Sequence, residues 1–241
     1  MNPFSDLSPL VQALAGALTQ AARQLQVDLS EEQTHNLLRY LALIERWNKV
    51  YNLTAVRELP AMLTQHLVDS LAVVAPLRRQ LQARLCVANG AAGAPDGSVR
   101  LLDVGAGAGL PGVVIAICCP DIRVSCVDTV AKKAAFIQQV AVTLKLPNLC
   151  GVHARVESLT GPFEVISSRA FASLADFVSG SRAALAEGGV WMAMKGKHPA
   201  PELAALTGLS RPVDVFHVEQ LAVPGLDAER CIVWMREKPA V

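Results

Sequence analysis

Residues 101–112 read LLDVGAGAGLPG, a β-prone run that passes into three alternating glycines and then a proline. This order predicts a strand, a tight turn and the start of a helix. Glycine lets a backbone turn sharply and approach a ligand closely, because it has no Cβ atom. Pro111 suits the first turn of a helix, where a missing amide hydrogen costs little. The stretch therefore predicts a ligand-binding turn in an α/β protein.

The spacing of the glycines separates two kinds of nucleoside-binding turn. Leu110 occupies the third-glycine position of the Gly-x-Gly-x-x-Gly turn that binds a dinucleotide pyrophosphate, which disfavours an NAD-dependent oxidoreductase. Asp103 precedes the glycines, and this acidic-x-Gly-x-Gly-x-Gly form resembles motif I of the Rossmann-like S-adenosylmethionine methyltransferases. In those proteins the loop passes under the methionine and ribose parts of a cofactor that has no phosphate.

A second acidic residue supports a cofactor that carries a ribose. Asp128 ends the next predicted strand, in the same strand–helix–strand unit as Gly105. A carboxylate there can accept hydrogen bonds from both ribose hydroxyls. The alternative is that Asp128 only caps the helix predicted over 131–145. Together the two signals favour a nucleoside cofactor, and S-adenosylmethionine over NAD.

Strands and helices alternate outward from this unit. The alternation predicts an α/β fold with a mostly parallel seven-stranded sheet. The resemblance of the glycine turn to motif I implies that this fold is a Rossmann-like methyltransferase. The last two strands have no helix between them, so we expect an antiparallel hairpin at the edge of the sheet. The predicted strands are 99–104, 123–127, 150–154, 163–168, 189–194, 213–218 and 231–236, and the predicted helices between them are 111–119, 131–145, 173–186 and 200–206.

The front of the chain is predicted to be helical. Apolar residues at helical spacing predict helices over 8–25 and 60–75, and Ser30 with Gln33 forms the capping-box pattern that begins another. We expect residues 46–54 to form an aromatic and basic loop. The predicted organisation is a helical subdomain over 1–86, a flexible Ala/Gly-rich linker over 87–98 and an S-adenosylmethionine-binding methyltransferase domain over 99–241.

Composition limits the classes of protein to which the chain can belong. With 241 residues, 52% of them hydrophobic, it is long enough for one full domain with an extension and is not a disordered chain. No signal-peptide pattern and no run of about 18 apolar residues occurs, so we expect a cytoplasmic protein without membrane association. The six cysteines form no Cys-x-x-Cys pair, and we expect no metal site.

Several independent motifs, in the same order along the chain, resemble those of the RsmG/GidB family. The resemblance covers about residues 35–236, whereas the 87–98 insertion and the longer N-terminus depart from the family pattern. The family comprises bacterial methyltransferases that modify guanine N7 in small-subunit ribosomal RNA, conventionally at position 527 of 16S rRNA. The motifs are Trp47-Asn48-Lys49 with Tyr51-Asn52-Leu53-Thr54, His66 with Asp69-Ser70, the 103–112 turn, and Ser168-Arg169-Ala170-Phe171-Ala172.

The resemblance implies which residues bind the cofactor, S-adenosylmethionine, which leaves as S-adenosylhomocysteine. Gly105 and Leu110 would belong to the loop under the cofactor, and Asp128 would meet the ribose. Arg169 would stand beside the cofactor and the target base as the catalytic residue, acting by positioning. On the residues alone, Glu157 and Arg169 would instead be read as solvated charges. The full expected set is Asp103, Gly105, Gly107, Gly109, Leu110, Asp128, Val156, Glu157 and Arg169.

The chemistry of methyl transfer to guanine N7 needs few protein groups. N7 presents a lone pair with no proton to remove, so positioning does most of the catalytic work and no general base is expected. The fourth predicted strand ends in Ser168-Arg169, where methyltransferases of exocyclic amines usually carry Asn/Asp-Pro-Pro-Tyr. Cys119-Pro120 reverses the Pro-Cys order of cytosine-C5 enzymes.

RNA must be held by positive charge, and a local patch can supply it despite a net charge of +1. Lys132, Arg155 and Lys195 follow or end predicted strands at the edge where α/β sheets bind ligands, and they are the candidate RNA contacts, with 16S rRNA or the small ribosomal subunit as the partner. Lys133 and Lys197 are expected to be solvated. No obligate protein partner is evident.

Two other functions stay open on the sequence alone. One is an S-adenosylmethionine-dependent methyltransferase for a small molecule, with the helical front acting as a lid. The other is a noncatalytic factor in ribosome assembly that binds S-adenosylmethionine or RNA. A neutral net charge slightly favours the small-molecule enzyme, and the family motifs oppose it.

Overall fold

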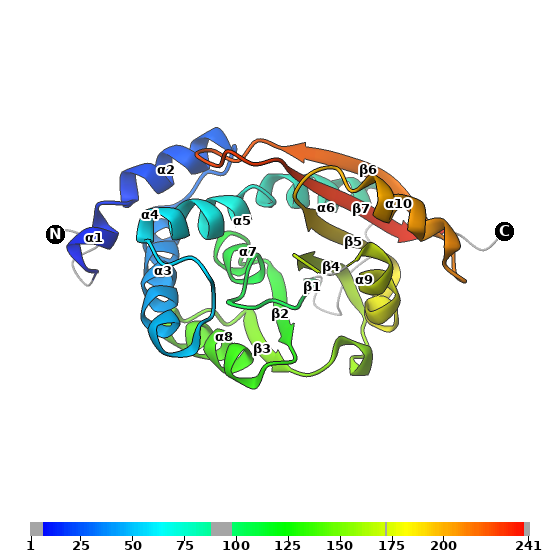
Figure 1. Ribbon diagram of the computed structural model, residues 1–241, viewed down its shortest axis with the longest axis horizontal. Helices are drawn as coiled ribbons and strands as arrows, with labels where there is room; N and C mark the ends of the chain where they lie inside the picture. Colours follow the sequence, from blue (N-terminus) through cyan, green and yellow to red (C-terminus); the bar gives the residue numbers. More distant parts are fainter. Residues whose placement is uncertain (1–6, 88–97, 172, 239–241) are drawn as a thin grey trace.

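A computed structural model describes residues 7–87, 98–171 and 173–238 (Figure 1). Its strands form a single seven-stranded sheet in the order β3-β2-β1-β4-β5-β7-β6. Neighbours from β3 to β5 are parallel, whereas β7 runs antiparallel to both β5 and β6. The mostly parallel sheet and the antiparallel hairpin at its edge are confirmed. The strands are β1 Val99–Val104, β2 Ile122–Asp128, β3 Leu149–His153, β4 Phe163–Arg169, β5 Leu185–Lys195, β6 Val213–Leu221 and β7 Arg230–Glu237.

Helices cover both faces of the sheet, because successive side chains of a strand point to opposite faces (Figure 1). Leu101 packs in the core shared with α7, α8 and the N-terminal helices. Its neighbour Leu102 packs in the second core, with α9. Every residue of α7 is buried, since this helix lies between the sheet and the N-terminal helices. The bounds are α7 Gly112–Cys118, α8 Ala131–Thr143, α9 Leu174–Ser181 and α10 Ala200–Ala205.

The N-terminal part is helical, as expected, with two differences from the sequence prediction. Residues 46–51 are not a loop, because α3 continues through them until Asn52 adopts the left-handed conformation, with φ 49° and ψ 52°. The helix α6 was not predicted, and most of the predicted 87–98 linker lies outside the described residues. The elements are α1 Pro9–Gln12, α2 Ala15–Gln24, α3 Glu31–Tyr51, α4 Leu59–Met62, a π-helical turn Leu63–Val68, α5 Asp69–Leu71 and α6 Val74–Val87.

Helix α3 runs from the amino ends of the strands to the glycine turn at their carboxyl ends. The predicted capping box is confirmed: Ser30 Oγ accepts from the Gln33 backbone N–H at 3.1 Å, and Gln33 Oε1 accepts from the Ser30 N–H at 3.0 Å. The Gln33 amide also donates to the Ile117 carbonyl, at the end of α7. Further along, the Tyr40 hydroxyl donates to the Ala108 carbonyl in the glycine turn at 2.6 Å. The helix therefore passes from the amino edge of the sheet to the ligand-binding turn.

Within the described ranges, no helix combines the length and the apolar character needed to cross a membrane. Likewise, no group of three or more metal-ligating side chains occurs among the described residues. Cys118 and Cys119 are buried in the first core, where burial raises the pKa of the Cys119 thiol to about 11. These two thiols act as small core side chains.

Candidate functional site

The turn between β1 and α7 depends on its glycines. Gly105, Gly107 and Gly109 have φ values of 66°, 61° and 91°, in the region that L side chains avoid. A Cβ on Gly109 would also lie 2.5 Å from Val113 Cγ2 and 3.3 Å from the Tyr40 hydroxyl oxygen. The turn therefore brings backbone close to helix α3 in a way that only glycine allows.

The Asp103 side chain holds the start of α7 and the neighbouring strand β4 next to this turn. Its side chain is fully buried, Oδ2 accepts from the Gly112 N–H at 3.0 Å, and Oδ1 accepts from the Ser167 hydroxyl at 2.8 Å. Burial raises the pKa of the Asp103 carboxyl from 3.8 to about 6, against the opposing effect of these two hydrogen bonds. Because both oxygens are engaged and enclosed, Asp103 ties β1, α7 and β4 together and does not line a cavity.

Asp128 faces the open side of the turn. Its Oδ2 accepts from the Gly107 N–H at 3.0 Å and lies 3.7 Å from Lys133 Nζ, while Oδ1 accepts from the Val130 N–H at 2.8 Å. The helix-cap alternative is wrong, because the N-cap of α8 is Val130 and no side chain caps that helix. A carboxylate accepts about four hydrogen bonds, so Asp128 retains capacity for further donors.

A cavity of about 360 Å³, here called the cofactor cavity, opens beside Asp128 at the carboxyl ends of β1 and β2. Valines from β1 and β2 give it apolar walls, and two carboxylates and two cations line it, so that their formal charges balance. This mixture of apolar lining with a few polar groups fits a nucleoside better than a pyrophosphate. Its lining includes Val104, Gly105, Val127, Asp128, Lys133, Arg155, Val156, Glu157 and Phe171.

The structure brings together only some of the residues expected at the cofactor. Gly105, Asp128, Val156 and Glu157 line the cofactor cavity, and Gly107 contributes its N–H to Asp128. Leu110 is buried in the core, and Arg169 lines a different cavity. Glu157 is exposed at the rim, where its own backbone N–H and Arg155 lower the pKa of its carboxyl.

Two lysines at the start of α8 differ in how they lie relative to the cofactor cavity. Lys132 is exposed and does not line the cofactor cavity. Lys133, expected to be solvated, lines the cavity next to Asp128, with a side chain 29% exposed. The helical rotation between adjacent residues decides which lysine faces the turn, and the exact start of the helix is hard to predict from sequence.

A second cavity, of about 550 Å³, adjoins the first through Phe171 and is here called the arginine cavity. Arg169, at the end of β4, donates from Nη1 to the Gln65 carbonyl and to Asp69 Oδ2, both at 3.0 Å. Arg230, at the start of β7, donates from Nε to Asp69 Oδ1 at 2.8 Å. Asp69 and Arg230 were not predicted as site residues, although Asp69 belongs to one of the family-like motifs.

Lys195 and His66 also line the arginine cavity, and each has a hydrogen-bond partner. Lys195 Nζ lies 2.7 Å from Glu202 Oε2 and donates to the Phe171 carbonyl at 3.2 Å. His66 Nε2 shares a 2.8 Å hydrogen bond with Thr54 Oγ1, and burial lowers the pKa of the imidazole. His66 is therefore hydrogen-bonded, and its burial favours the neutral imidazole.

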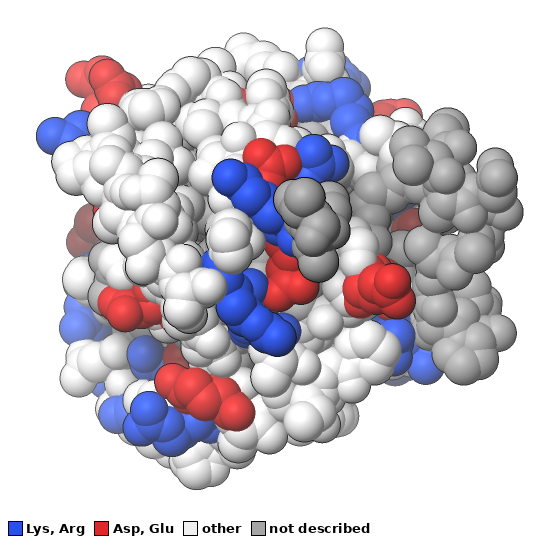
Figure 2. Space-filling view, turned by 90° about the vertical axis from the view of Figure 1, so that its right-hand side faces the viewer, with Lys and Arg blue, Asp and Glu red and all other residues white. Residues whose placement is uncertain are grey.

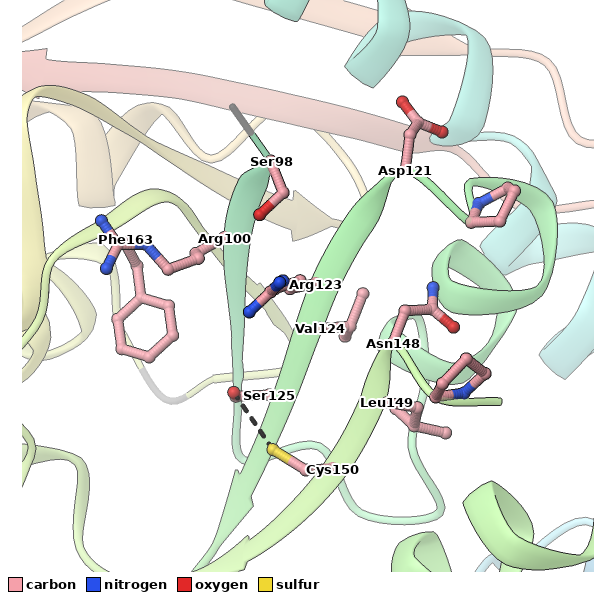
Figure 3. Close-up of a pocket in the computed structure, with 12 residues that line it drawn as sticks. Ser98, Arg100, Asp121, Arg123, Val124, Ser125, Asn148, Leu149, Cys150 and Phe163 are labelled. Carbon is pink, nitrogen blue, oxygen red and sulfur yellow. Dashed lines mark hydrogen bonds between the residues drawn. The ribbon is translucent and has the colours of Figure 1, made fainter. Parts of the chain in front are cut away.

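Another cavity, of about 730 Å³, lies at the opposite edge of the sheet (Figure 3). Its lining residues stand at the amino ends of the strands, among them Ser98, Asp121 and Phe163. Arg123 and Cys150 also face it, and the Cys150 thiol lies 3.2 Å from the Ser125 hydroxyl. Open α/β sheets bind ligands at the carboxyl ends of their strands, so this cavity is not the candidate site.

The charges on one side of the molecule are mixed, and one of the aromatic side chains of α3 is packed against α8. On the side of the molecule that carries α10 and the end of β7, basic and acidic side chains are interspersed (Figure 2). Trp47 is half-buried, with its ring 5.2 Å from that of Phe136 and 5.1 Å from that of Tyr51. Trp47 therefore packs between α3 and α8, and only Tyr51 is exposed.

The fold, the glycine turn and the carboxylate beside it define a Rossmann-like methyltransferase that uses S-adenosylmethionine. A family model described as rRNA small subunit methyltransferase G, or GidB, matches residues 33–233. The chain belongs to this family, as the sequence motifs had indicated.

Two curated relatives support the same assignment over more than nine tenths of the chain. A protein from Acidovorax ebreus (strain TPSY), described as ribosomal RNA small subunit methyltransferase G, is 63% identical over 93% of this chain and 96% of its own length. A protein of the same description from Acidovorax sp. (strain JS42) is 64% identical over 91% and 94%. Among solved structures, TrmN from Thermus thermophilus matches 70% of this chain and 49% of its own, with 17% identity and a TM-score of 0.48.

Proposed function

We propose that the chain transfers a methyl group from S-adenosylmethionine to N7 of a guanine in 16S rRNA, at the position conventionally numbered 527. One observation carries the proposal: a nucleoside-sized cavity adjoins, through Phe171, a cavity that is lined by three cations and whose two carboxylates are both ion-paired. Family membership supports ribosomal RNA as the substrate. The reaction would then take place in the cytoplasm, on the small subunit or its rRNA.

The cofactor cavity suits S-adenosylmethionine. The backbone at Gly105 would pass under the cofactor, and the spare acceptor capacity of Asp128 would take the ribose hydroxyls. Val156 and Glu157 would flank the adenine. When bound, the cofactor supplies a methyl group that its sulfonium has already activated. The protein therefore has to orient the two reactants rather than activate either.

The arginine cavity suits an acceptor that loses no proton. Both of its carboxylates, Asp69 and Glu202, are ion-paired. His66 has Nε2 engaged by Thr54, and its Nδ1 is buried without a hydrogen-bond partner. Guanine N7 needs no base, because its lone pair lies in the ring plane. Methylation leaves the ring cationic, so the arginines would hold groups other than N7, such as phosphate or O6.

Methyl transfer from radiolabelled S-adenosylmethionine to small ribosomal subunits tests the proposal. The subunits would come from cells that lack the homologous activity, and nucleoside analysis would follow. We expect label in 7-methylguanosine, abolished by Gly105→Arg, since a long side chain at φ 66° would fill the cofactor cavity. Absence of label on subunits and on extracted 16S rRNA, despite cofactor binding, would favour a small-molecule substrate or a binding-only factor.

Substitution of the candidate RNA contacts gives a second readout. Arg155 lines the cofactor cavity, Lys195 lines the arginine cavity, and Lys132 is exposed beside them at the start of α8. Neutral variants of residues that touch phosphate should weaken RNA binding evenly across sequences.

A further inference from the structure

One buried carboxylate holds two arginines from distant parts of the chain. Asp69 is the first residue of α5, Arg169 the last of β4 and Arg230 the first of β7. The Asp69 side chain is only 3% exposed, and each of its oxygens receives one guanidinium, at 3.0 and 2.8 Å. A buried carboxylate is stable when it is paired in this way. The arrangement fixes the two guanidinium groups side by side.

Both arginines keep donors that the protein does not use. Arg169 makes its hydrogen bonds through Nη1, and Arg230 uses Nε with Asp69 and Nη1 with the Glu229 carbonyl. A guanidinium has five N–H groups, so Nε and Nη2 of Arg169 and Nη2 of Arg230 have no acceptor among the described residues. Both side chains line the arginine cavity and are 22% and 25% exposed. Cationic donors thus face the space beside the cofactor cavity.

The charges of the cavity leave a positive surplus for a ligand. Three cations line it, against the two carboxylates Asp69 and Glu202. Glu202 forms an ion pair with Lys195. The surplus positive charge therefore lies on the two arginines that share Asp69. Paired guanidinium forks match the oxygens of a phosphate in both geometry and charge.

We propose that Arg169 and Arg230, aligned by Asp69, form a clamp for one backbone phosphate of the RNA strand that carries the target nucleotide. The proposal rests on the proposed function only in taking RNA as the substrate. Asp69 is then a positioning residue, which acts through the two arginines. A clamp on the backbone also explains how cations can stand near a base that becomes positively charged.

The salt dependence of rRNA binding tests the clamp. Arg230→Gln should lower the slope of log K against log salt by about 0.7–0.9, the contribution of one phosphate contact, with roughly tenfold weaker binding at low salt. S-adenosylmethionine affinity should not change. Arg236→Gln is a matched control on the same strand, because Arg236 Nε lies 2.8 Å from Asp214 Oδ2, outside the cavity. It should keep the wild-type slope.

Wild-type slope and affinity in folded Arg230→Gln would overturn the clamp. If that variant unfolds at the assay temperature, Arg230→Lys is measured in its place. The lysine keeps the positive charge, so the salt slope should stay at the wild-type value, whereas loss of the guanidinium fork should weaken rRNA binding severalfold. A lysine variant with wild-type affinity would equally overturn it.

Asp69→Asn separates positioning from simple electrostatics. Removal of a negative charge alone should leave RNA binding equal or tighter, whereas loss of alignment should lower kcat by at least about tenfold. An Asp69→Asn protein with wild-type kcat would refute the positioning role. Label in a nucleoside other than 7-methylguanosine would defeat the proposed function and leave the clamp intact. If the wild-type protein binds no rRNA, the phosphate clamp is refuted, because the clamp requires RNA as the substrate.

Discussion

At the scale of single residues, two carboxylates at the ends of neighbouring strands have different tasks. Asp103 is enclosed on all sides, and its oxygens receive the Gly112 N–H and the Ser167 hydroxyl. Asp128 ends the adjacent strand but borders the cofactor cavity. The first carboxylate therefore shapes the turn, and the second is available to a ligand. Sequence position alone does not separate them, because both follow apolar strand residues.

Asp103 should make stability depend on pH. Its folded-state pKa, about 6, lies above the unfolded value of 3.8, so the folded protein binds the proton more tightly. The stability from this group is complete below about pH 4 and is lost as the pH rises through 6. Asp103→Asn should therefore gain up to about 3 kcal/mol relative to wild type between pH 4 and pH 7 in urea unfolding. Asp121→Asn, at an exposed carboxyl, is the control; an equal pH response in both variants would refute this account.

Arg169→Ala should lower kcat about 100-fold, because misplacement of a reactant by about 1 Å is enough for such a loss. The fold should persist, since Asp69 keeps its partner Arg230. Single-turnover methyl transfer measures the first effect, and the thermal unfolding midpoint measures the second. An Arg169→Ala enzyme with wild-type kinetics would remove Arg169 from the site.

At the scale of elements, helix α3 controls the shape of the glycine turn. The Tyr40 hydroxyl donates a hydrogen bond to the buried Ala108 carbonyl, and Tyr40→Phe leaves that carbonyl without this donor. We expect a loss of about 1–3 kcal/mol in urea unfolding and weaker binding of S-adenosylmethionine by calorimetry. Tyr51→Phe, on the same helix but 39% exposed, should change neither quantity. Equal behaviour of the two variants would mean that the Tyr40 hydroxyl does not hold the turn.

The elements that local sequence determines were predictable. The capping box at Ser30 and the strand–glycine–helix junction at 101–112 carry their own hydrogen-bonding and backbone signals. The end of α3 was predicted wrongly, because Asn52 takes a left-handed conformation that a glycine would have signalled more clearly. Helix α6 was missed because its apolar residues do not follow one clear stripe.

From the residues alone, the site was predictable only where it lies on one strand–helix–strand unit, whereas Val156 and Glu157 were expected from the family resemblance. Gly105 and Asp128 come from such a unit, so their spacing along the chain already places them together. Asp69 and Arg230 are 161 residues apart and meet only because β7 inserts between β5 and β6. A contact of this kind depends on tertiary topology, which residue spacing does not encode.

At the scale of the whole molecule, one continuous core joins the N-terminal helices to the sheet. Buried side chains of α2 and α3, such as Leu18 and Leu41, belong to the same cluster as Val113 of α7 and Val124 of β2. Without the N-terminal helices, the fully buried α7 would expose an apolar face. The predicted boundary near residues 87–98 therefore does not separate two independent cores.

This continuity predicts a single cooperative unfolding transition. Trp47 reports on α3, whereas Trp191 and Trp234 report on the sheet. Two variants test this, one with Trp47 as its single tryptophan and one with Trp234. In each variant, the urea midpoint measured by tryptophan fluorescence should equal the midpoint measured by circular dichroism. S-adenosylmethionine at 100 times its Kd should stabilise both by about 2.7 kcal/mol, and Asp128→Ala should abolish that gain. An earlier midpoint at Trp47 would instead show that the helical part unfolds first, because the contacts of α3 with α7 and α8 would then be weaker than the sheet itself.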